Sequence, residues 1–182
     1  MTNDGRIQDT DKPKYAAKSK QSQYDGGLRT PIMLEWPAKI RPTMSDTVVS
    51  SMDISPPLLD AVGFVKREGL QRVSLRDSAM LAGRNAVFGE CFTHNSKDLA
   101  NPSGSLRWRW VIPDEWKLIV PAAQNEPDAK TELYDLKADP AEEKEFFTVE
   151  TDRVGRMRAV LDTWRKGWSA FLTLRRQAAT VA

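Results

Sequence analysis

Two cationic side chains stand on either side of a double glycine near the beginning of the sequence. Lys20 precedes Gly26-Gly27 and Arg29 follows it, with Pro31 closing the stretch. Adjacent glycines permit positive φ and let the backbone pass close to another group, and the proline keeps Thr30 extended. Two cations on a shaped loop are suited to holding a tetrahedral dianion such as sulfate or phosphate. The alternative is a solvated lysine and an arginine tied to a structural carboxylate.

A second group of polar side chains lies at the N-terminus. Asn3-Asp4-Gly5 places two oxygen-bearing side chains and a glycine in a loop, which suits a hard cation such as calcium. Two ligands do not complete a site of about six to eight oxygens, so a metal here needs carboxylates from elsewhere. The alternative is an ordinary turn, for which Asn-Asp-Gly is a common sequence.

His94 is the only histidine in the sequence. It follows the end of an expected strand, a place where side chains that contact ligands often lie. A single histidine with no visible base or nucleophile partner specifies no mechanism. Contact with a substrate and a polar surface position therefore both remain open for His94.

Trp108 and Trp110 alternate with Arg107 and Arg109. An aromatic and cationic surface of this kind is one way to bind nucleic acid. Strict alternation in a strand puts both tryptophans on one face, where we expect the apolar stripe of the last helix to cover them. In that interpretation the two arginines face water.

The composition limits the classes of partner. The 182 residues are 40% hydrophobic, which is enough for a folded core, and 27 basic against 25 acidic residues leave a net charge of +2. Neither sign dominates, so we expect no nucleic-acid partner and no membrane-surface partner. Cys91 stands alone and permits no intrachain disulfide. No apolar run approaches the ~18 residues of a spanning helix, and the N-terminus lacks the apolar core of a signal peptide.

The first half of the sequence reads as separate pieces of a larger α/β body. We expect irregular structure over 1–23, and a strand covered on both faces over 31–36. Residues 46–51 read as a short strand or extended segment. A helix is expected within 52–63, capped by Asp53 or Ser55 and closed by Gly63, and a second one over 74–81, closed by Gly83.

The second half reads as a small antiparallel sheet followed by a helix. Three or four strands are expected, with candidates separated by turn residues over 85–92, 106–112, 116–120 and 132–136. An apolar stripe at helical spacing then predicts a helix of about five turns, on Val154, Met157, Leu161, Trp164, Trp168 and Phe171. The chain is therefore expected to divide into 1–83 and 84–182, with the first part incomplete.

The loop that carries Lys20 resembles the K-x-x-x-Y-[DE]-G-G-x-R-x-P segment of the sulfatases. Further pieces match the same family in order. They are Asn3-Asp4-Gly5 where the family has Asp-Asn-Gly, Trp36-Pro37 with Lys39-Ile40, Ser50 to Pro56, Trp116 to Ile119, and Glu132 to Pro140 with its E-L-Y-D-L-x-x-D-P pattern. The ordered succession, from residue 2 to about 164, makes the resemblance specific.

The resemblance implies an α/β fold of the alkaline-phosphatase-like sulfatase type, of which 1–83 completes the catalytic domain and 84–182 is the C-terminal α+β subdomain. It implies hydrolysis of sulfate esters or sulfamates of small aryl or carbohydrate substrates, with bound calcium and a formylglycine hydrate made from Cys or Ser in C/S-x-P-S-R. Lys20 matches the lysine that contacts sulfate, and Asn3 and Asp4 match two calcium ligands. Arg29 matches a position that we interpret as structural.

Two departures from the family pattern bear on activity. The metal pair is Asn-Asp rather than Asp-Asn, which moves the carboxylate to a neighbouring position of the loop. No C/S-x-P-S-R motif occurs, because Cys91 is followed by Phe-Thr-His and Ser55-Pro56-Pro57 lacks the arginine. The sequence thus resembles the C-terminal portion of an arylsulfatase-type enzyme, which we expect to be inactive alone, with the formylglycine half as a possible separate chain. The alternative is a non-catalytic module that binds a sulfated glycan or a protein partner around His94 and Trp108.

Overall fold

The computed structural model describes residues 18–20, 22–64, 73–98 and 100–180, with side chains described as far as residue 167. The chain divides into two compact units, Met1–Val87 and Phe88–Ala182. We refer to them as unit 1 and unit 2. The assignment of 1–83 to a catalytic domain and of 84–182 to a separate subdomain stays a prediction.

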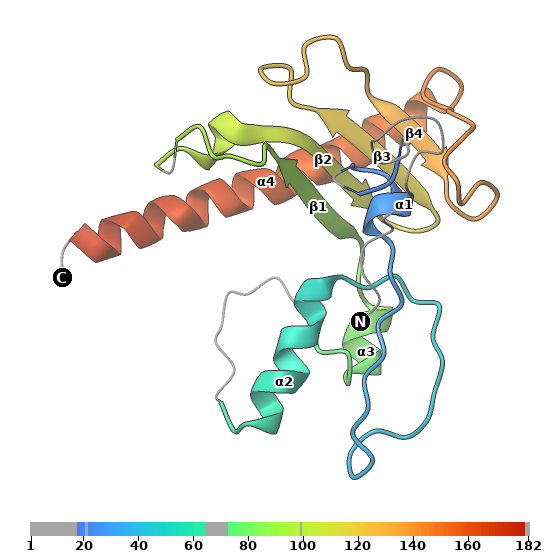
Figure 1. The fold of residues 1–182 in the computed structure, drawn as a ribbon, viewed down its shortest axis with the longest axis vertical. Helices are drawn as coiled ribbons and strands as arrows, with labels where there is room; N and C mark the ends of the chain where they lie inside the picture. Colours follow the sequence, from blue (N-terminus) through green and yellow to red (C-terminus); the bar gives the residue numbers. More distant parts are fainter. Residues whose placement is uncertain (1–17, 21, 65–72, 99, 181–182) are drawn as a thin grey trace. The chain divides into compact units, whose positions relative to one another are not determined.

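Short helical segments connected by extended chain make up the described part of unit 1 (Figure 1). The predicted helix within 52–63 is present as a short 3-10 turn that continues into an α-helix, whereas the helix expected over 74–81 begins four residues later than expected. The elements are α1 (Asp25–Leu28), the 3-10 turn (Ser51–Ile54), α2 (Ser55–Ala61) and α3 (Ser78–Ala82).

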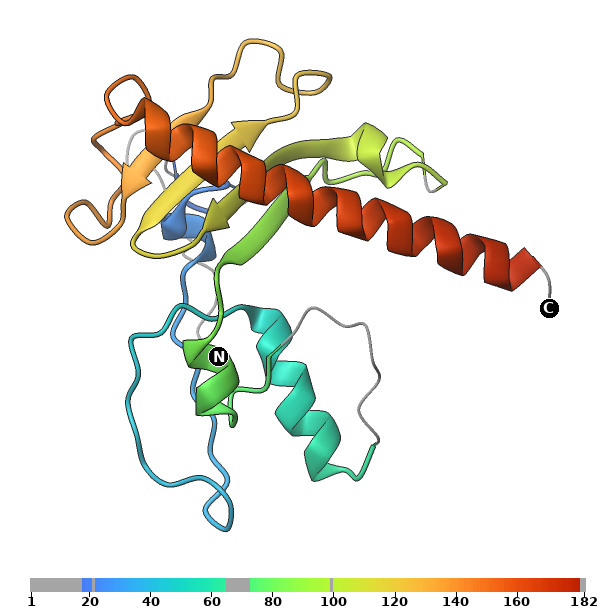
Figure 2. The ribbon, with the colours of Figure 1, turned by 180° about the vertical axis from the view of Figure 1, so that it is seen from behind.

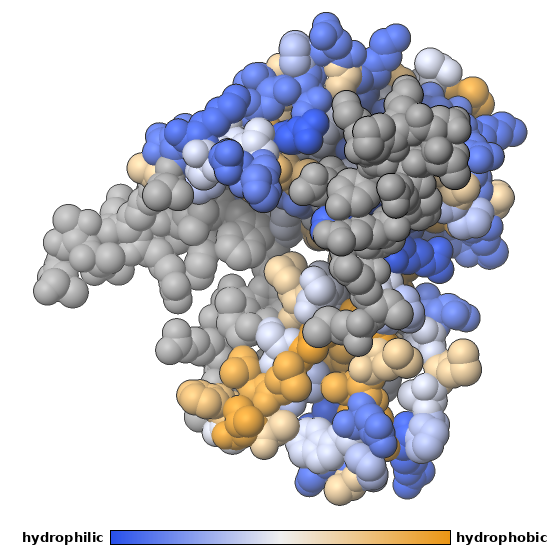
Figure 3. All heavy atoms as spheres, viewed as in Figure 1, coloured by the Kyte–Doolittle hydropathy of each residue, from blue (hydrophilic) through white to orange (hydrophobic). Residues whose placement is uncertain are grey.

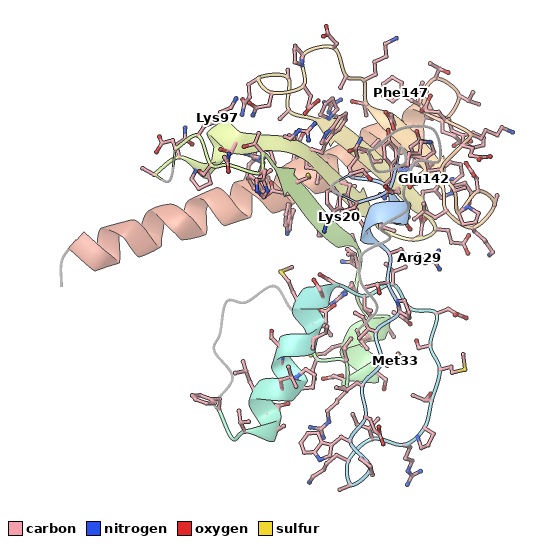
Figure 4. All side chains as sticks on the ribbon, viewed as in Figure 1. Lys20, Arg29, Met33, Lys97, Glu142 and Phe147 are labelled. Carbon is pink, nitrogen blue, oxygen red and sulfur yellow. The ribbon has the colours of Figure 1, made fainter. Side chains whose placement is uncertain are left out.

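The strand predicted over 31–36 is wrong, because these residues form no regular element. Ile32, Leu34 and Trp36 are half-buried. Met33, which is labelled in Figure 4, is 78% exposed and projects from this loop. A buried strand requires a neighbouring strand for its backbone hydrogen bonds. Within the described ranges the only sheet is that of unit 2, so the apolar run has no strand to pair with.

The side-chain cap of this segment lies at the 3-10 turn before α2, which differs from the sequence expectation. Ser50 is the N-cap, and its hydroxyl accepts a hydrogen bond from the Met52 amide at 3.3 Å. Asp53 completes a capping box by accepting from the Ser50 amide at 2.8 Å, so neither Asp53 nor Ser55 is the cap itself. Gly63 has φ of +75°, the left-handed conformation expected at its position.

Unit 2 contains the predicted antiparallel sheet. Its strands lie in sequence order, with β2 antiparallel to β3 and β3 antiparallel to β4. They are β1 (Val87–Phe92), β2 (Leu106–Ile112), β3 (Trp116–Pro121) and β4 (Glu132–Asp135). The last helix, α4 (Thr151–Thr180), runs across one face of this sheet and extends beyond it (Figure 2). The sheet with its C-terminal helix confirms the expected α+β subdomain.

The helix of 30 residues is long enough to span a bilayer by length alone. Among the described residues, however, neither α4 nor any other helix combines that length with enough apolar character to cross a membrane.

The core of unit 2 lies between α4 and one face of the sheet. The register places Val111 opposite Leu118, and Leu118 opposite Leu133, so these three side chains share that face. All three are fully buried. From α4, the matching apolar positions of the predicted stripe are Val154, Met157 and Leu161, which are buried as well. At the sheet edge the rings of Phe88 and Trp164 stack at 4.8 Å, joining β1 to α4.

The two tryptophans of β2 lie on the opposite face of the sheet, which corrects the expectation that α4 covers them. The Trp110 ring occupies the space above Gly89, where an added Cβ would lie 2.2 Å from the ring. Arg109 instead points to the helix side, where its guanidinium lies 2.8 Å from the Asp162 carboxylate of α4. Alternation decided that Trp108 and Trp110 share a face, but not which face the helix would choose.

The arginines of β2 also do not simply face water. Arg107 pairs with Glu126, and Arg109 pairs with Asp162. The predicted alternation of tryptophan and arginine is therefore a structural pattern, in which aromatic rings fill one face and ion pairs fix the other to its neighbours.

A buried ion pair lies on the tryptophan face of the sheet. Lys117 of β3 approaches Glu142 to 2.9 Å, and the two side chains are 0% and 1% exposed. Glu142, labelled in Figure 4, has φ of +57°, a conformation that costs a non-glycine residue on the order of 1 kcal/mol. The pair attaches the chain after β4 to the sheet and holds Glu142 in this position.

We expect the Lys117→Met variant to lose about 3–5 kcal/mol of unfolding free energy, because it leaves the Glu142 carboxylate buried without its cation. The double variant Lys117→Met with Glu142→Leu should recover most of that loss. Urea unfolding measures both. Lys137→Met is the matched control, since its pair with Glu115 is exposed and its loss should have little effect. Equal destabilisation by Lys117→Met and Lys137→Met would contradict the role of the buried pair.

Candidate functional site

The loop that carries Lys20 is closed by hydrogen bonds within itself. The Ser19 carbonyl accepts from the Ser22 amide at 3.2 Å and from the Ser22 hydroxyl at 2.5 Å. The Gly27 amide donates to the Tyr24 carbonyl at 2.9 Å, and the Arg29 amide donates to the Asp25 carbonyl at 2.7 Å. The loop therefore turns directly into the single helical turn α1.

The double glycine is required by close backbone packing rather than by positive φ. A Cβ on Gly26 would lie 2.5 Å from the Lys18 carbonyl oxygen, and one on Gly27 would lie 2.2 Å from the Ser19 carbonyl oxygen. Only glycine allows the turn of α1 to rest directly on the chain that precedes Lys20. Of the two possibilities that sequence offered for the glycines, the structure uses the close approach.

The side chains of the loop divide between structural contacts and an available cation (Figure 4). The Lys18 ammonium lies 4.9 Å from the centre of the Tyr24 ring, a cation–π contact. Lys20 is half-buried, and among the residues that the structure describes no carboxylate pairs with it. Arg29 is exposed, and the expected structural carboxylate is not found for it in the described ranges. The contact of Lys18 with Tyr24 was not predicted from sequence, because Lys18 lies before the loop pattern, which begins at Lys20.

Asp53 connects the segment before α2 to chain much further along unit 1. Its carboxylate accepts from the Ser50 amide at 2.8 Å, from the Val73 amide at 2.9 Å and from the Arg84 guanidinium at 2.7 Å. Burial pushes the pKa of Asp53 upward, but the hydrogen bonds from Arg84, Val73 and Ser50 outweigh it and hold the pKa below its ordinary value. Sequence reasoning considered Asp53 only as a helix cap, because a partner 31 residues away leaves no local signal.

His94 lies in unit 2, in the loop after β1, and its side chain is exposed. Lys20 belongs to unit 1, so the two residues lie in different units. A role for His94 in contacting a substrate stays a prediction.

The expected calcium ligands Asn3 and Asp4 lie outside the described residues. Among the residues that are described, no group of three or more His, Cys, Asp or Glu side chains is arranged to hold a metal ion. The calcium prediction therefore depends on oxygen donors at the N-terminus and on the resemblance to sulfatases.

Cys91, the single cysteine, is not arranged as a nucleophile. It lies half-buried in β1, and burial, together with Glu126, raises the pKa of its thiol, although the cation of Arg107 opposes the shift. The thiolate is the reactive form of cysteine, so a raised pKa lowers its reactivity near neutral pH.

Comparison with known proteins identifies the family. The family model described as "N-sulphoglucosamine sulphohydrolase, C-terminal" matches residues 15–163, a range that includes the Lys20 loop, α2 and the whole sheet. The chain belongs to this family. The match confirms the predicted resemblance to the C-terminal portion of sulfatases.

Relatives of this sulfatase family member agree with the assignment. The N-acetylgalactosamine-6-O-sulfatase of Bacteroides thetaiotaomicron is 24% identical over 146 residues, which are 79% of this chain and 29% of that protein. A solved structure labelled 6S-sulf, from work on the metabolism of multiple glycosaminoglycans by Bacteroides thetaiotaomicron, is 22% identical. It matches with a TM-score of 0.58 over 82% of this chain and 32% of that one, which confirms the fold. The chain thus spans about a third of the length of these relatives.

We expect Gly27→Ala to destabilise the protein by about 1–3 kcal/mol, because the new Cβ meets the backbone of Ser19, which has no rotamer to change. Gly155→Ala is the matched control: nothing lies within 4 Å of a Cβ at that position of α4, so alanine should stabilise by up to about 1 kcal/mol. Thermal unfolding measures both variants. An unchanged melting temperature for Gly27→Ala would show that the double glycine is dispensable.

The lowered pKa of Asp53 predicts a loss of stability in acid. A carboxyl with a folded-state pKa below its ordinary value of 3.8 stabilises the fold above that pH, and the contribution is lost as the pH falls through the folded-state pKa. NMR titration of the Ser50 and Val73 amides, which donate to this carboxylate, should give an apparent pKa below 3.8.

In the Asp53→Asn variant, both amides should lose the acid transition, and the stability should become less dependent on pH in this range. A transition for wild-type Asp53 at or above pH 3.8 would contradict the inference.

Proposed function

We propose that this chain supplies the sulfate-binding cation Lys20 to a sulfatase that hydrolyses sulfate esters or sulfamates of carbohydrates. The observation that carries the proposal is the family match across residues 15–163, which includes the loop with Lys20. The name of the N-acetylgalactosamine-6-O-sulfatase supports a sulfated amino sugar as the class of substrate. Aryl sulfates are the natural chromogenic probe for the same reaction.

The loop geometry is consistent with the proposed role of Lys20. The close packing of Gly26 and Gly27 fixes the backbone on either side of this lysine, and no described carboxylate neutralises its charge. A preorganised cation stabilises the negative charge on sulfate oxygens more effectively than a mobile one, because it needs no reorganisation during the reaction. Lys18, which contacts Tyr24, is less suited to this role.

The nucleophile is proposed to come from outside this chain. The formylglycine hydrate of the complete enzyme would supply the nucleophile, and the sequence contains no motif for it. Asn3 and Asp4 are proposed to contribute two oxygen ligands to the calcium site. The chain on its own is therefore proposed to be catalytically inert.

The alternative of a non-catalytic glycan-binding module receives less support. That interpretation used Trp108 together with His94, but the Trp108 side chain is only 8% exposed and offers little surface to a sugar. His94 alone remains available. We therefore retain the sulfatase role, with His94 as a proposed contact for the substrate.

The experiment compares sulfate release from 6-sulfated N-acetylgalactosamine and from an aryl sulfate. The purified chain alone should release none. When it is co-expressed with a polypeptide that carries the formylglycine motif, Lys20→Gln should lower kcat/KM by roughly 100-fold, and Lys20→Arg by less. Lys39→Gln is the matched control on an exposed lysine of unit 1 and should have no effect. Sulfate release by the chain alone, or equal loss in both lysine variants, would overturn the proposal.

A further inference from the structure

Lys18 has a backbone conformation that a residue with a side chain rarely adopts. Its φ is +62°, in the left-handed region, where the Cβ lies too close to the following carbonyl oxygen. Glycine and asparagine are the residues that suit this region best. A residue held in such a conformation persists only where the surrounding structure fixes it, and functional sites are a common place for it. The backbone alone therefore does not favour a lysine at this position, two residues before Lys20.

Two contacts hold Lys18 against the chain that follows Lys20. Its carbonyl oxygen packs against Gly26 of α1, where an added Cβ would lie only 2.5 Å from it. Its ammonium lies 4.9 Å from the centre of the ring of Tyr24, the residue that precedes α1. Both side chains of this cation–π contact are half-buried, and partial removal from water strengthens such a contact. Lys18 thus contacts the beginning of α1 through its backbone and through its side chain.

The segment between Lys18 and Tyr24 carries Lys20. Within it the Ser22 amide donates to the Ser19 carbonyl at 3.2 Å, and the Tyr24 carbonyl at its end accepts from the Gly27 amide at 2.9 Å. A contact that joins the two ends of a segment closes it into a loop and reduces the number of conformations open to the residues inside. The contact of Lys18 with Tyr24 therefore restricts the backbone of Lys20.

Polar contacts and backbone packing hold this loop. The buried side chains in the described part of 18–28 are polar, and they are Ser19, Gln23 and Asp25. Apolar surface in unit 1 gathers over α2 instead (Figure 3). Where a loop is held by a few polar contacts, each of them has a large share in fixing its position. The contact of Lys18 with Tyr24 is one of these.

We propose that Lys18 is a positioning residue for Lys20, and that its contact with the Tyr24 ring holds the loop so that the Lys20 ammonium is in place before sulfate binds. This inference deepens the proposed function and rests on it for the role of Lys20. A loop that is already ordered loses less conformational entropy when it binds a dianion than a loop that must become ordered. Lys18 itself stays on the aromatic ring and does not contact the sulfate.

Amide hydrogen exchange on this chain tests the positioning. Lys18→Asn removes the ammonium, and asparagine suits the left-handed backbone, so the variant adds no backbone strain. It should raise the exchange rates of the Ser22 and Gly27 amides roughly fivefold, whereas Lys18→Arg should keep the parent rates, because a guanidinium also stacks on an aromatic ring. Exchange of the Val73 amide, which donates to Asp53, should stay unchanged and so show that the rest of unit 1 remains folded.

A double-mutant cycle and a matched control separate this contact from general loosening of unit 1. Tyr24→Leu should raise the same two exchange rates as much as Lys18→Asn does, and the double variant should raise them no further, because the contact is lost only once. Arg76→Met is the control, since the Arg76 guanidinium also lies 4.9 Å from the centre of a ring, that of Trp36 in unit 1. It should leave both rates unchanged. Parent rates in Lys18→Asn, or additive effects in the double variant, would overturn the inference.

Titration with inorganic sulfate, followed by NMR of the lysine side chains, tests the consequence for binding. Lys18→Asn should weaken sulfate binding at Lys20 roughly fivefold, and Lys18→Arg should restore it. Weaker binding without faster exchange of the Ser22 and Gly27 amides would overturn the inference, because Lys18 would then contact the sulfate itself. Absence of sulfate binding at Lys20 in the parent chain, with the exchange rates as expected, upholds the positioning and contradicts the proposed function instead.

Discussion

The contact between the double glycine and the carbonyls of Lys18 and Ser19 is the constraint on which the candidate site depends. Backbone atoms meet there without an intervening side chain, so the distance between α1 and the preceding loop is set by van der Waals contact of the backbone rather than by adjustable side-chain rotamers. The loop hydrogen bonds of Ser19 and Ser22 add to that constraint. The backbone of a lysine on such a loop is held in a fixed position. An electrostatic role requires this, because the charge must already be in place when the substrate reacts.

In unit 2, side-chain packing and ion pairs rather than backbone contacts fix the positions of the elements. Its sheet carries an aliphatic core on the α4 face, while the other face combines tryptophans with the buried pair of Lys117 and Glu142. The α4 face also carries ionic contacts, since Arg109 pairs with Asp162 and Glu90 pairs with Arg165, and both partners belong to the helix. Charged groups that are fixed by partners of opposite sign favour one arrangement of helix and sheet over its alternatives.

Unit 1 combines a well-satisfied polar centre with a poorly covered apolar surface. Asp53 connects three parts of the unit through its hydrogen bonds, but Leu58, Val62 and Phe64 remain in contact with solvent. The family match and the partial coverage of longer relatives offer one physical reason for that combination. We interpret unit 1 as part of a larger α/β body, in which it keeps its internal hydrogen bonds while the remainder of that body covers its apolar side chains.

The sequence by itself determined the features that depend on local pattern. The four strands and the long helix followed from period and turn residues, the left-handed Gly63 followed from its place after a helix, and the family followed from ordered motifs. Tertiary structure decided what depends on distant partners: that 31–36 forms no strand, that α4 covers the Arg109 face rather than the Trp108 face, and that Asp53 binds Arg84. The physical reason is that alternation and propensity act within a few residues. The pairing of strands, the sheet face that a helix covers and the partners of an ion pair depend on groups far away in the chain.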